Sequence, residues 1–280
     1  MKFNELNLDE SVLQALDAMN FQECTPVQEH TIPVILEGHD LIGVAQTGTG
    51  KTAAYLLPVL NQLSKGTYPA DAINCVIMSP TRELAQQIDQ QMEGFSYFMP
   101  ASSVAVYGGN DGIRFEQEKR GLTLGADVVI ATPGRLISHL SMGYVDFSKV
   151  SFFILDEADR MLDMGFYDDI MQIVKQLPDT RQTIMFSATM PDKIQKLAAN
   201  ILRNPVEVRL AVNKPAEKIV QTAYVCYEAQ KMGIIKSLFK ETKPERVIVF
   251  SSSKLKVKEV TNAFRHKISV QNLSTFRRSS

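Results

Sequence analysis

The sequence predicts an α/β fold in which a parallel sheet is covered by helices on both faces. Short apolar runs alternate with amphipathic segments along most of the 280 residues, which is typical of strand and crossover-helix units. One apolar run, Phe152–Leu155, is unbroken and bulky, as in a strand buried on both faces. It ends on carboxylates at Asp156, Glu157 and Asp159. Because ligands of open α/β folds bind at the carboxyl ends of strands, these acids mark a candidate site.

The predicted elements of the first part follow one another along the chain. Apolar runs predict strands at residues 41–45, 73–79, 103–107, 127–132, 152–156 and 183–187. Helical periodicity predicts helices at residues 52–65, 82–95, 134–140 and 192–202. An extended segment follows near Pro205, and these elements together form a first domain over residues 1–210.

The Pro-containing stretch 211–218 is interpreted as an interdomain linker. A partial second unit is expected over residues 219–280, with strands at 220–228 and 246–252 and helices at 231–241 and 254–267. From about residue 265 the chain becomes polar and rich in serine and arginine.

Composition excludes several classes of protein. The chain is 45% hydrophobic, which suits a large globular domain, and no apolar run is long enough to span a bilayer. The start lacks the apolar core of a signal peptide. Cys24, Cys75 and Cys226 are far apart and odd in number, and the four histidines lack metal-ligand spacing, so neither a disulfide framework nor a zinc site is indicated. A cytoplasmic location is the expectation.

Charge is unevenly divided along the chain. Residues up to Lys218 hold 18 basic and 27 acidic side chains, a net charge of −9, whereas the remainder holds 12 basic and 4 acidic, a net charge of +8. These sums return the overall −1. A basic C-terminal part is compatible with a polyanionic partner, although basic runs are usually solvated surface.

A phosphate-binding loop is indicated directly after the strand at residues 41–45, where "AQTGTGKT" opens a long helix. Gly48 and Gly50 allow backbone N–H groups to approach phosphate oxygens, and the helix N-terminus adds its positive dipole. Lys51 is expected to reach the β- and γ-phosphates, and the Thr52 hydroxyl to bind Mg²⁺. The general pattern has glycine where this chain has Ala45.

The acids after Phe152–Leu155 complete such a site. A carboxylate pair after a strand is often only a solvated turn, with Asp156 or Asp159 capping the next helix. A nucleoside triphosphate, however, needs an acid for Mg²⁺ and a group that orients the attacking water. Asp156 is predicted to bind the metal, and Glu157 to position the water, with Lys51 as the third catalytic residue.

With "AQTGTGKT" and "DEAD" in this order, the chain resembles the DEAD-box ATP-dependent RNA helicases of superfamily 2. The resemblance implies a RecA-like P-loop NTPase domain that binds ATP and Mg²⁺. "FQECTPVQ" looks like the family's adenine-reading motif, in which Gln28 bonds the base edge, and Phe3 occupies the place of the upstream aromatic residue that stacks on it. Phe3 and Phe21 considered alone are equally compatible with core residues. The implied nucleotide-binding residues are Phe3, Phe21, Gln28, Thr47, Gly48, Thr49, Gly50, Lys51 and Thr52.

Three further stretches match the family's RNA-contacting motifs: "PTRELA", a glycine pair and "TPGR". The resemblance implies that they grip the sugar-phosphate backbone of single-stranded or short duplex RNA without reading its sequence. The implied RNA-binding residues are Pro80, Thr81, Arg82, Gly108, Gly109, Thr132, Pro133, Gly134 and Arg135. Without the family, "TPGR" is a helix N-cap followed by proline in the first turn.

A last motif, "SAT", matches the family's link between the nucleotide site and domain closure. The implied coupling residues are Ser187, Thr189 and Asp159. Alone, a Ser-Ala-Thr after a strand is only a weak capping signal. The resemblance extends to about Phe264, with ribonucleoprotein partners as a further implication and a monomer as the expected state.

The resemblance stops early in the second RecA-like domain. The chain has "RVIVFSSS" and the helix after it, but no Thr-Asp segment and no arginine-rich motif follow. An arginine finger is worth about 10³ to 10⁵ in rate in related phosphoryl transfers. The sequence therefore leaves three readings open: an RNA helicase, a truncated module that binds ATP and RNA with little turnover, and a different P-loop machine such as a DNA translocase.

Overall fold

The structure is a computed structural model that describes residues 1–109, 112–210, 220, 222–242, 247–251 and 253–264. The chain divides into two compact units, Met1–Asn213 and Lys214–Ser280. The expected linker at 211–218 and the polar tail from about residue 265 lie outside the described residues. The detailed domain boundaries therefore stay a prediction.

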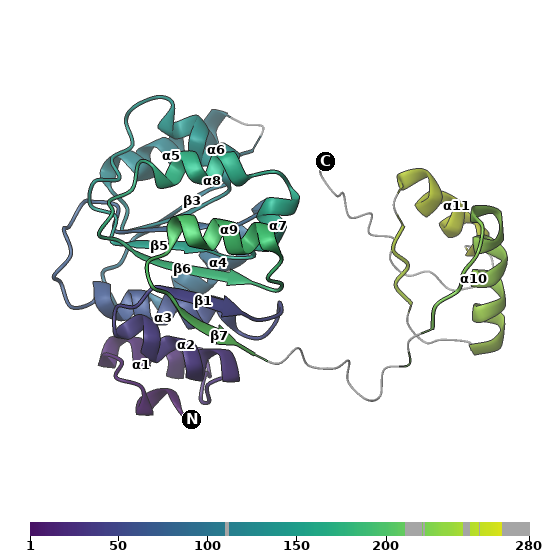
Figure 1. Cartoon of the computed structure of the whole chain (residues 1–280), viewed down its shortest axis with the longest axis horizontal. Coiled ribbons are helices and arrows are strands. Elements are labelled where there is room, and N and C mark those ends of the chain that lie inside the picture. Colours follow the sequence, from purple (N-terminus) through teal and green to yellow (C-terminus); the bar gives the residue numbers. More distant parts are fainter. Residues whose placement is uncertain (110–111, 211–219, 221, 243–246, 252, 265–280) are drawn as a thin grey trace. The chain divides into compact units, whose positions relative to one another are not determined.

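The first unit is built on a seven-stranded sheet in the order β3-β4-β2-β5-β6-β1-β7 (Figure 1). All its strand pairs are parallel. The strands are β1 (Leu41–Val44), β2 (Cys75–Met78), β3 (Ser103–Val106), β4 (Val128–Ala131), β5 (Phe152–Leu155), β6 (Gln182–Ser187) and β7 (Val206–Arg209). The predicted fold class is confirmed for this unit, since a parallel sheet with crossover helices is what the alternation of apolar runs indicates.

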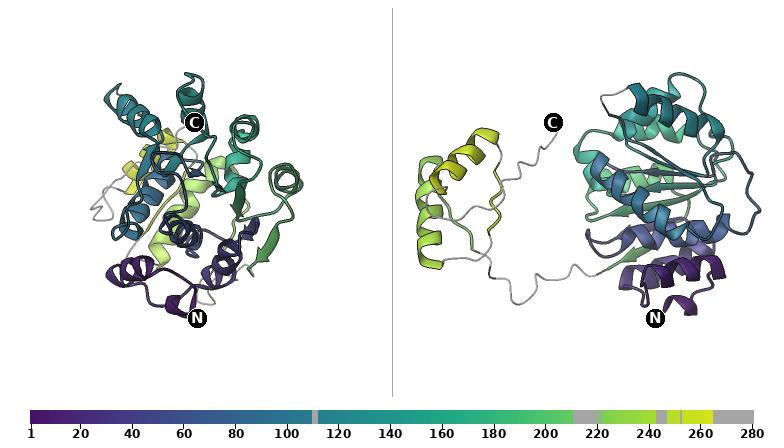
Figure 2. Two further views of the ribbon diagram at one scale, coloured as in Figure 1. Left: turned by 90° about the vertical axis from the view of Figure 1, so that its left-hand side faces the viewer. Right: turned by 180° about the vertical axis from the view of Figure 1, so that it is seen from behind.

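Helices lie on both sides of this sheet (Figure 2). They are a 3₁₀ turn η1 (Phe3–Glu5) and α1 (Glu10–Ala18), α2 (Pro26–Leu36), α3 (Lys51–Leu63), α4 (Arg82–Phe95), α5 (Gly112–Leu124), α6 (Pro133–Leu140), α7 (Ala158–Asp163), α8 (Tyr167–Val174) and α9 (Asp192–Ile201). Several begin on residues suited to helix starts: Thr81 accepts a hydrogen bond from the Leu84 N–H at 3.3 Å, and Pro26 and Pro133 occupy first-turn positions.

The strands alternate their side chains between two apolar cores. Ile154 and Ile77 pack with residues of α1 to α4 on one face, whereas Phe153 and Val76 pack with residues of α6 to α9 on the other. Because successive side chains of a strand point to opposite faces, a run such as Phe152–Leu155 must be apolar at every position. This explains why the central strands are continuous hydrophobic runs.

The second unit contains α10 (Glu228–Thr242) and α11 (Lys254–Phe264), close to the two predicted helices. The strands predicted at 220–228 and 246–252 are wrong for the described residues, since none of residues 222–227 and 247–251 lies in a strand. Their apolar side chains are exposed, with Val225 and Phe250 among the most accessible. A short strand needs neighbouring strands and a covered face to be stable, and the described part of this unit supplies neither.

Candidate functional site

Apart from Phe3, Phe21 and Gln28, which precede β1, the motif residues lie at or after the carboxyl ends of parallel strands, so they share one edge of the sheet. The loop 45–50 follows β1, Ser187 ends β6, and Asp156 follows β5. The stretches 80–82, 108–109 and 132–135 follow β2, β3 and β4. Since β1, β6 and β5 are neighbours, as are β2, β4 and β3, the edge is divided into a phosphate-binding half and a second half. The strand order that creates this division is not visible in the sequence.

The loop 45–50 turns on two glycines with left-handed backbone conformation. Gly48 has φ 84° and Gly50 has φ 92°, values that side-chain-bearing residues rarely adopt. A Cβ at Gly48 would meet nothing within 4 Å, so the backbone there is open to a ligand. The Thr49 hydroxyl bonds the Gln46 carbonyl at 2.8 Å, which tightens the turn. Lys51 and Thr52 then open α3, as the phosphate-loop pattern predicts.

Gln28 lies against this loop and is only 2% exposed. Its Nε2 donates to the Gly50 carbonyl at 3.1 Å, and its Oε1 accepts from the Thr25 N–H at 2.8 Å. A Cβ at Gly50 would lie 2.5 Å from Gln28 Nε2, so the glycine is required for this approach. The proposed adenine-reading side chain is thus bonded to the phosphate loop itself, and its role toward a base stays a prediction.

Phe3 and Phe21 are brought together near the N-terminus, with ring centroids 6.4 Å apart in an edge-to-face arrangement. Both line a cavity of about 420 Å³ beside η1 and α1. Phe3 is 3% exposed and belongs to the core, whereas Phe21 is half-buried and also contacts Phe95. Gln28 does not line this cavity, so a shared role of the three residues toward one base stays a prediction.

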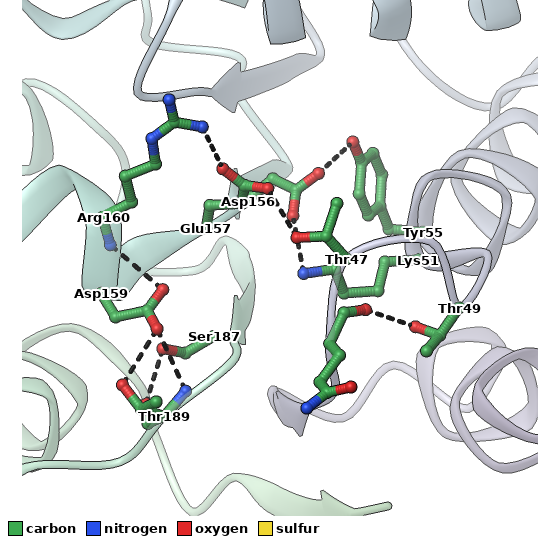
Figure 3. A network of polar contacts seen from close by, with 11 residues as sticks. Thr47, Thr49, Lys51, Tyr55, Asp156, Glu157, Asp159, Arg160, Ser187 and Thr189 are labelled. Carbon is green, nitrogen blue, oxygen red and sulfur yellow. Dashed lines mark hydrogen bonds and ion pairs between the residues drawn. The ribbon is translucent and has the colours of Figure 1, made fainter. Parts of the chain in front are cut away.

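The Asp156 carboxylate lies at the centre of the phosphate-binding half and is 2% exposed (Figure 3). The Tyr55 hydroxyl donates to its Oδ2 at 3.1 Å, and Lys51 Nζ lies 3.8 Å from its Oδ1. Burial raises the pKa of Asp156, while the Lys51 charge opposes that rise. Burial likewise raises the pKa of Tyr55, so its hydroxyl keeps its proton and remains a donor.

Two buried polar atoms of this pair lack a hydrogen-bond partner: Lys51 Nζ and Asp156 Oδ1. Opposite charges held buried and unsatisfied at the mouth of a phosphate loop fit a bound phosphate and a divalent cation. Among the described residues, no group of three or more His, Cys, Asp and Glu is placed to hold a metal ion. Mg²⁺ usually takes one or two carboxylates together with water and substrate phosphates, and the Asp156 carboxylate can serve as such a ligand.

Glu157 joins the two motifs of this half directly. The Thr47 hydroxyl donates to its Oε1 at 3.0 Å, and Arg160 Nη1 donates to its Oε2 at 3.1 Å. Its backbone is left-handed, with φ 54°, and it stands at the N-cap position of α7 without a capping side-chain bond. The simpler interpretation of Asp156 or Asp159 as the helix cap is therefore wrong, because the chain turns into α7 at Glu157.

The predicted coupling residues contact one another (Figure 3). Both the backbone N–H and the hydroxyl of Thr189 donate to Asp159 Oδ2, at 3.1 Å and 2.9 Å. The Ser187 hydroxyl donates to the Thr189 carbonyl at 2.7 Å. The loop after β6 is thus tied to the start of α7, which also carries the Arg160 partner of Glu157. Asp159 thus connects the start of α7 to the "SAT" loop, and a coupling role for these residues stays a prediction.

The motif residues after β2, β3 and β4 form the second half of the edge, and their side chains range from buried to exposed. Arg82 and Gly134 are exposed, Thr81 and Thr132 are half-buried helix N-caps, and Pro80 and Pro133 are buried. The N-termini of α4 and α6 therefore face the edge, where free N–H groups and the helix dipole favour anions. Gly108 and Gly109 follow β3 in the neighbouring loop.

Sequence reasoning missed three residues that organise the site: Tyr55, Arg160 and Glu118. Tyr55 lies within an apolar helix and its hydroxyl gave no separate signal. Arg160 follows "DEAD" directly and is partly exposed, so it was not distinguished from a solvated charge. Glu118 is 2% exposed, yet its helix has no clear apolar face that would have marked the acid as buried.

No helix in the described parts of the chain is long and apolar enough to cross a membrane.

Comparison with known proteins agrees with this geometry. Residues 25–197 match the model of the family described as DEAD/DEAH box helicase. The chain is 39% identical over 263 residues to the ATP-dependent RNA helicase CshA of Listeria monocytogenes, covering 94% of this chain and 49% of that protein. It is also 39% identical over 266 residues to the DEAD-box ATP-dependent RNA helicase CshA of Streptococcus pneumoniae, covering 95% and 50%.

Among solved structures, a DEAD box protein from the hyperthermophile Methanococcus jannaschii resembles the chain with a TM-score of 0.70 and 30% identity. That match covers 95% of this chain and 70% of the other. The chain spans about half the length of the two curated relatives just described.

Proposed function

The chain belongs to the DEAD/DEAH box helicase family, and on this premise we propose that it binds ATP and RNA and couples ATP hydrolysis to the unwinding or remodelling of RNA. The observation that carries the proposal is the group Thr47, Lys51, Asp156 and Glu157, which joins the phosphate loop after β1 to the two acids after β5, on either side of β6. The two curated relatives of the chain are named as ATP-dependent RNA helicases, which supports RNA rather than DNA as the substrate.

In this proposal the phosphate loop binds the nucleotide. Backbone N–H groups around Gly48 hold phosphate oxygens, and Lys51, whose ammonium is buried without a hydrogen-bond partner, turns from Asp156 to the β- and γ-phosphates. Gln28 and the aromatic pair Phe3 and Phe21 recognise the base. Gln28 would have to exchange one of its present bonds for the base edge, because both of its amide atoms are already engaged.

Thr52 and Asp156 are the proposed holders of Mg²⁺, through Oδ1 of the carboxylate. When bound, the ion neutralises charge that develops on the phosphates. Glu157 orients the attacking water and accepts its proton at Oε1 once the Thr47 hydroxyl has moved away. Asp159, Ser187 and Thr189 relay the state of this site to the rest of the chain.

For the second half of the edge we propose RNA binding by residues 80–82, 108–109 and 132–135. Helix N-termini and an exposed arginine suit phosphate and ribose contacts, which are independent of sequence. We also propose ribonucleoprotein partners, a monomeric state, and a cytoplasmic location. The last agrees with three free cysteines at Cys24, Cys75 and Cys226, as reduced compartments favour.

A second candidate is a binding module that holds ATP and RNA without efficient turnover. Residues 1–280 contain no counterpart of the family's arginine-rich motif, and an arginine finger is worth about 10³ to 10⁵ in rate in related phosphoryl transfers. For the domain organisation we propose the boundaries predicted from the sequence: a first domain at residues 1–210, a linker at 211–218 and a partial second domain at 219–280.

The test is release of phosphate from ATP by the 280-residue chain, with and without single-stranded RNA. Lys51→Ala and Glu157→Gln are compared with Lys65→Ala and Glu116→Gln, which remove the same charges from exposed positions. RNA-stimulated turnover lost only in the first pair supports the enzyme. Turnover by the native chain no higher than that of Glu157→Gln refutes it, and nucleotide binding measured alongside then decides for or against the binding module.

A further inference from the structure

Glu118 on α5 is a buried acid that belongs to none of the recognised motifs. One carboxylate oxygen, Oε1, accepts the backbone N–H of Gly108 at 3.0 Å. The other, Oε2, accepts Nε of Arg135 at 2.6 Å. A single side chain that is 2% exposed thus connects the loop after β3 to the helix after β4.

Two further groups complete the surroundings of this carboxylate. His139 Nε2 lies 3.0 Å from Oε2, and Arg114 Nε lies 3.6 Å from Oε1. Because an ionised carboxylate only accepts hydrogen bonds, His139 must donate from Nε2. Its Nδ1 is bonded to the Tyr144 hydroxyl, and in the neutral ring it accepts that proton. Every partner of Glu118 is therefore a donor.

Packing fixes the Arg135 side chain from other sides as well. Gly108 has φ 74°, and a Cβ there would lie 3.3 Å from Arg135 Cδ. The guanidinium carbon lies 4.5 Å from the centroid of the Phe115 ring, and Phe115 stacks on His139 with centroids 4.4 Å apart. The arginine is thus held by a carboxylate, an aromatic face and a glycine backbone.

The charge balance argues that Glu118 does not serve to attract a polyanion. Burial alone raises its pKa, but the hydrogen bonds from His139, Arg135 and Gly108 outweigh burial and lower the pKa. The group is therefore ionised near neutral pH and offsets part of the Arg135 charge. A negative charge beside a phosphate-binding surface opposes binding by Coulomb's law, so its contribution must be geometric.

We propose that Glu118 is a positioning residue for RNA, which holds the Gly108 loop and the Arg135 guanidinium in the one relative placement that lets both contact the same sugar-phosphate strand. This inference rests on the proposed function, because the RNA-binding role of residues 108–109 and 132–135 belongs to that proposal. His139, Phe115 and Tyr144 support the carboxylate and the guanidinium from behind.

The inference predicts a change in RNA affinity opposite in sign to the change that charge alone predicts. Replacing Glu118 by glutamine removes a negative charge, which by charge alone tightens RNA binding. It also replaces one acceptor oxygen by an NH₂ group that must face the Gly108 N–H on one side or the Arg135 and His139 donors on the other. One of the two motifs then loses its hold, and RNA binding weakens.

The experiment measures binding of a fluorescently labelled single-stranded oligouridylate to the 280-residue chain by anisotropy, across a series of salt concentrations. For Glu118→Gln we expect about tenfold weaker binding and a salt slope smaller by roughly one phosphate contact. Glu116→Gln, on the same helix and exposed, makes the same charge change and should bind at least as tightly as the native chain. Affinity for a fluorescent adenine nucleotide should remain within about twofold in both variants, because the nucleotide site and the proposed RNA-binding half are separate parts of the sheet edge.

Glu118→Asp is the second variant, in case the buried glutamine prevents folding. It keeps the charge but is one methylene shorter, so it cannot reach both partners, and RNA binding should weaken in the same way. Native-like RNA affinity in either folded variant, with an unchanged salt slope, overturns the inference while leaving the proposed function intact. Failure of the native chain itself to bind RNA overturns the proposed function and the inference with it.

Discussion

The buried pair of Lys51 and Asp156 makes a specific prediction about stability. Their side chains are 5% and 3% exposed, and Nζ lies 3.8 Å from Oδ1. At an effective dielectric constant of about 20, Coulomb's law gives roughly 4 kcal/mol for unit charges at this distance. Removing one partner of a buried pair typically destabilises a protein by about 3 to 5 kcal/mol, because the remaining charge is left uncompensated. Lys51→Ala should therefore lower the free energy of unfolding by about this amount.

The same pair predicts how that loss depends on pH. The pKa of Asp156 is raised by burial and held down by Lys51, so removing the lysine raises it further. An acid whose pKa is raised in the folded state destabilises the fold when pH lies above that folded-state pKa. This destabilisation disappears as pH falls through the folded-state pKa toward the pKa of the unfolded state. The difference between Lys51→Ala and the native chain should thus be larger at about pH 8 than at about pH 5.5.

Urea unfolding followed by circular dichroism measures this difference, with Lys65→Ala as the matched control. The double variant Lys51→Ala, Asp156→Asn removes both charges and should recover more than half of the loss. If Lys51→Ala has the free energy of unfolding of the native chain near pH 8, or loses the same amount at both pH values, the argument that the Asp156 carboxylate is left uncompensated is refuted.

Three further predictions concern other parts of the first unit. Gly43→Ala places a Cβ 2.3 Å from the Phe186 ring and should destabilise by about 1 to 3 kcal/mol, measured as a shift in urea midpoint; Gly112→Ala, which meets nothing within 4 Å, should not. Thr189→Val removes the hydroxyl bond to the last acid of "DEAD", and should reduce RNA unwinding by about tenfold while ATP turnover falls less; equal losses would contradict a coupling role. Gln28→Ala leaves the Gly50 carbonyl without this donor, and should weaken nucleotide binding by about tenfold in calorimetric titration; unchanged affinity would exclude a role in the nucleotide site.

Most of the sheet could be predicted because its central strands are buried on both faces. A run such as Phe152–Leu155 has no polar alternative, and the phosphate loop after β1 carries its own glycine spacing. Strand order could not be predicted, since it depends on which helices cross which face rather than on any local pattern. The strands expected at 220–228 and 246–252 are absent from the described residues of these ranges for a related reason: local β-propensity does not form a strand without partners.

The contacts within the candidate site were also only partly visible in the sequence. Motif spacing identified Asp156 and Glu157, but not the Tyr55 hydroxyl on Oδ2 of the aspartate or the Arg160 guanidinium on the glutamate. Such contacts join residues from separate elements, and the residue types alone allow many other partners. Glu118 is the clearest case, because a glutamate on a mostly polar helix is normally solvated.

The bonding of the site implies that nucleotide binding is chiefly an exchange of hydrogen bonds. Glu157 is already bonded to Thr47, and Gln28 to Gly50, so a ligand that engages these groups replaces bonds of similar strength and gains little net free energy. Lys51 Nζ and Asp156 Oδ1 differ, because both are buried without a hydrogen-bond partner. New hydrogen bonds to these two atoms replace no hydrogen bond, only the ion pair between Nζ and Oδ1 at 3.8 Å, and they also relieve the cost of burying charge. ATP and Mg²⁺ should therefore draw most of their affinity from the two residues of this site whose charged atoms are buried without a hydrogen-bond partner.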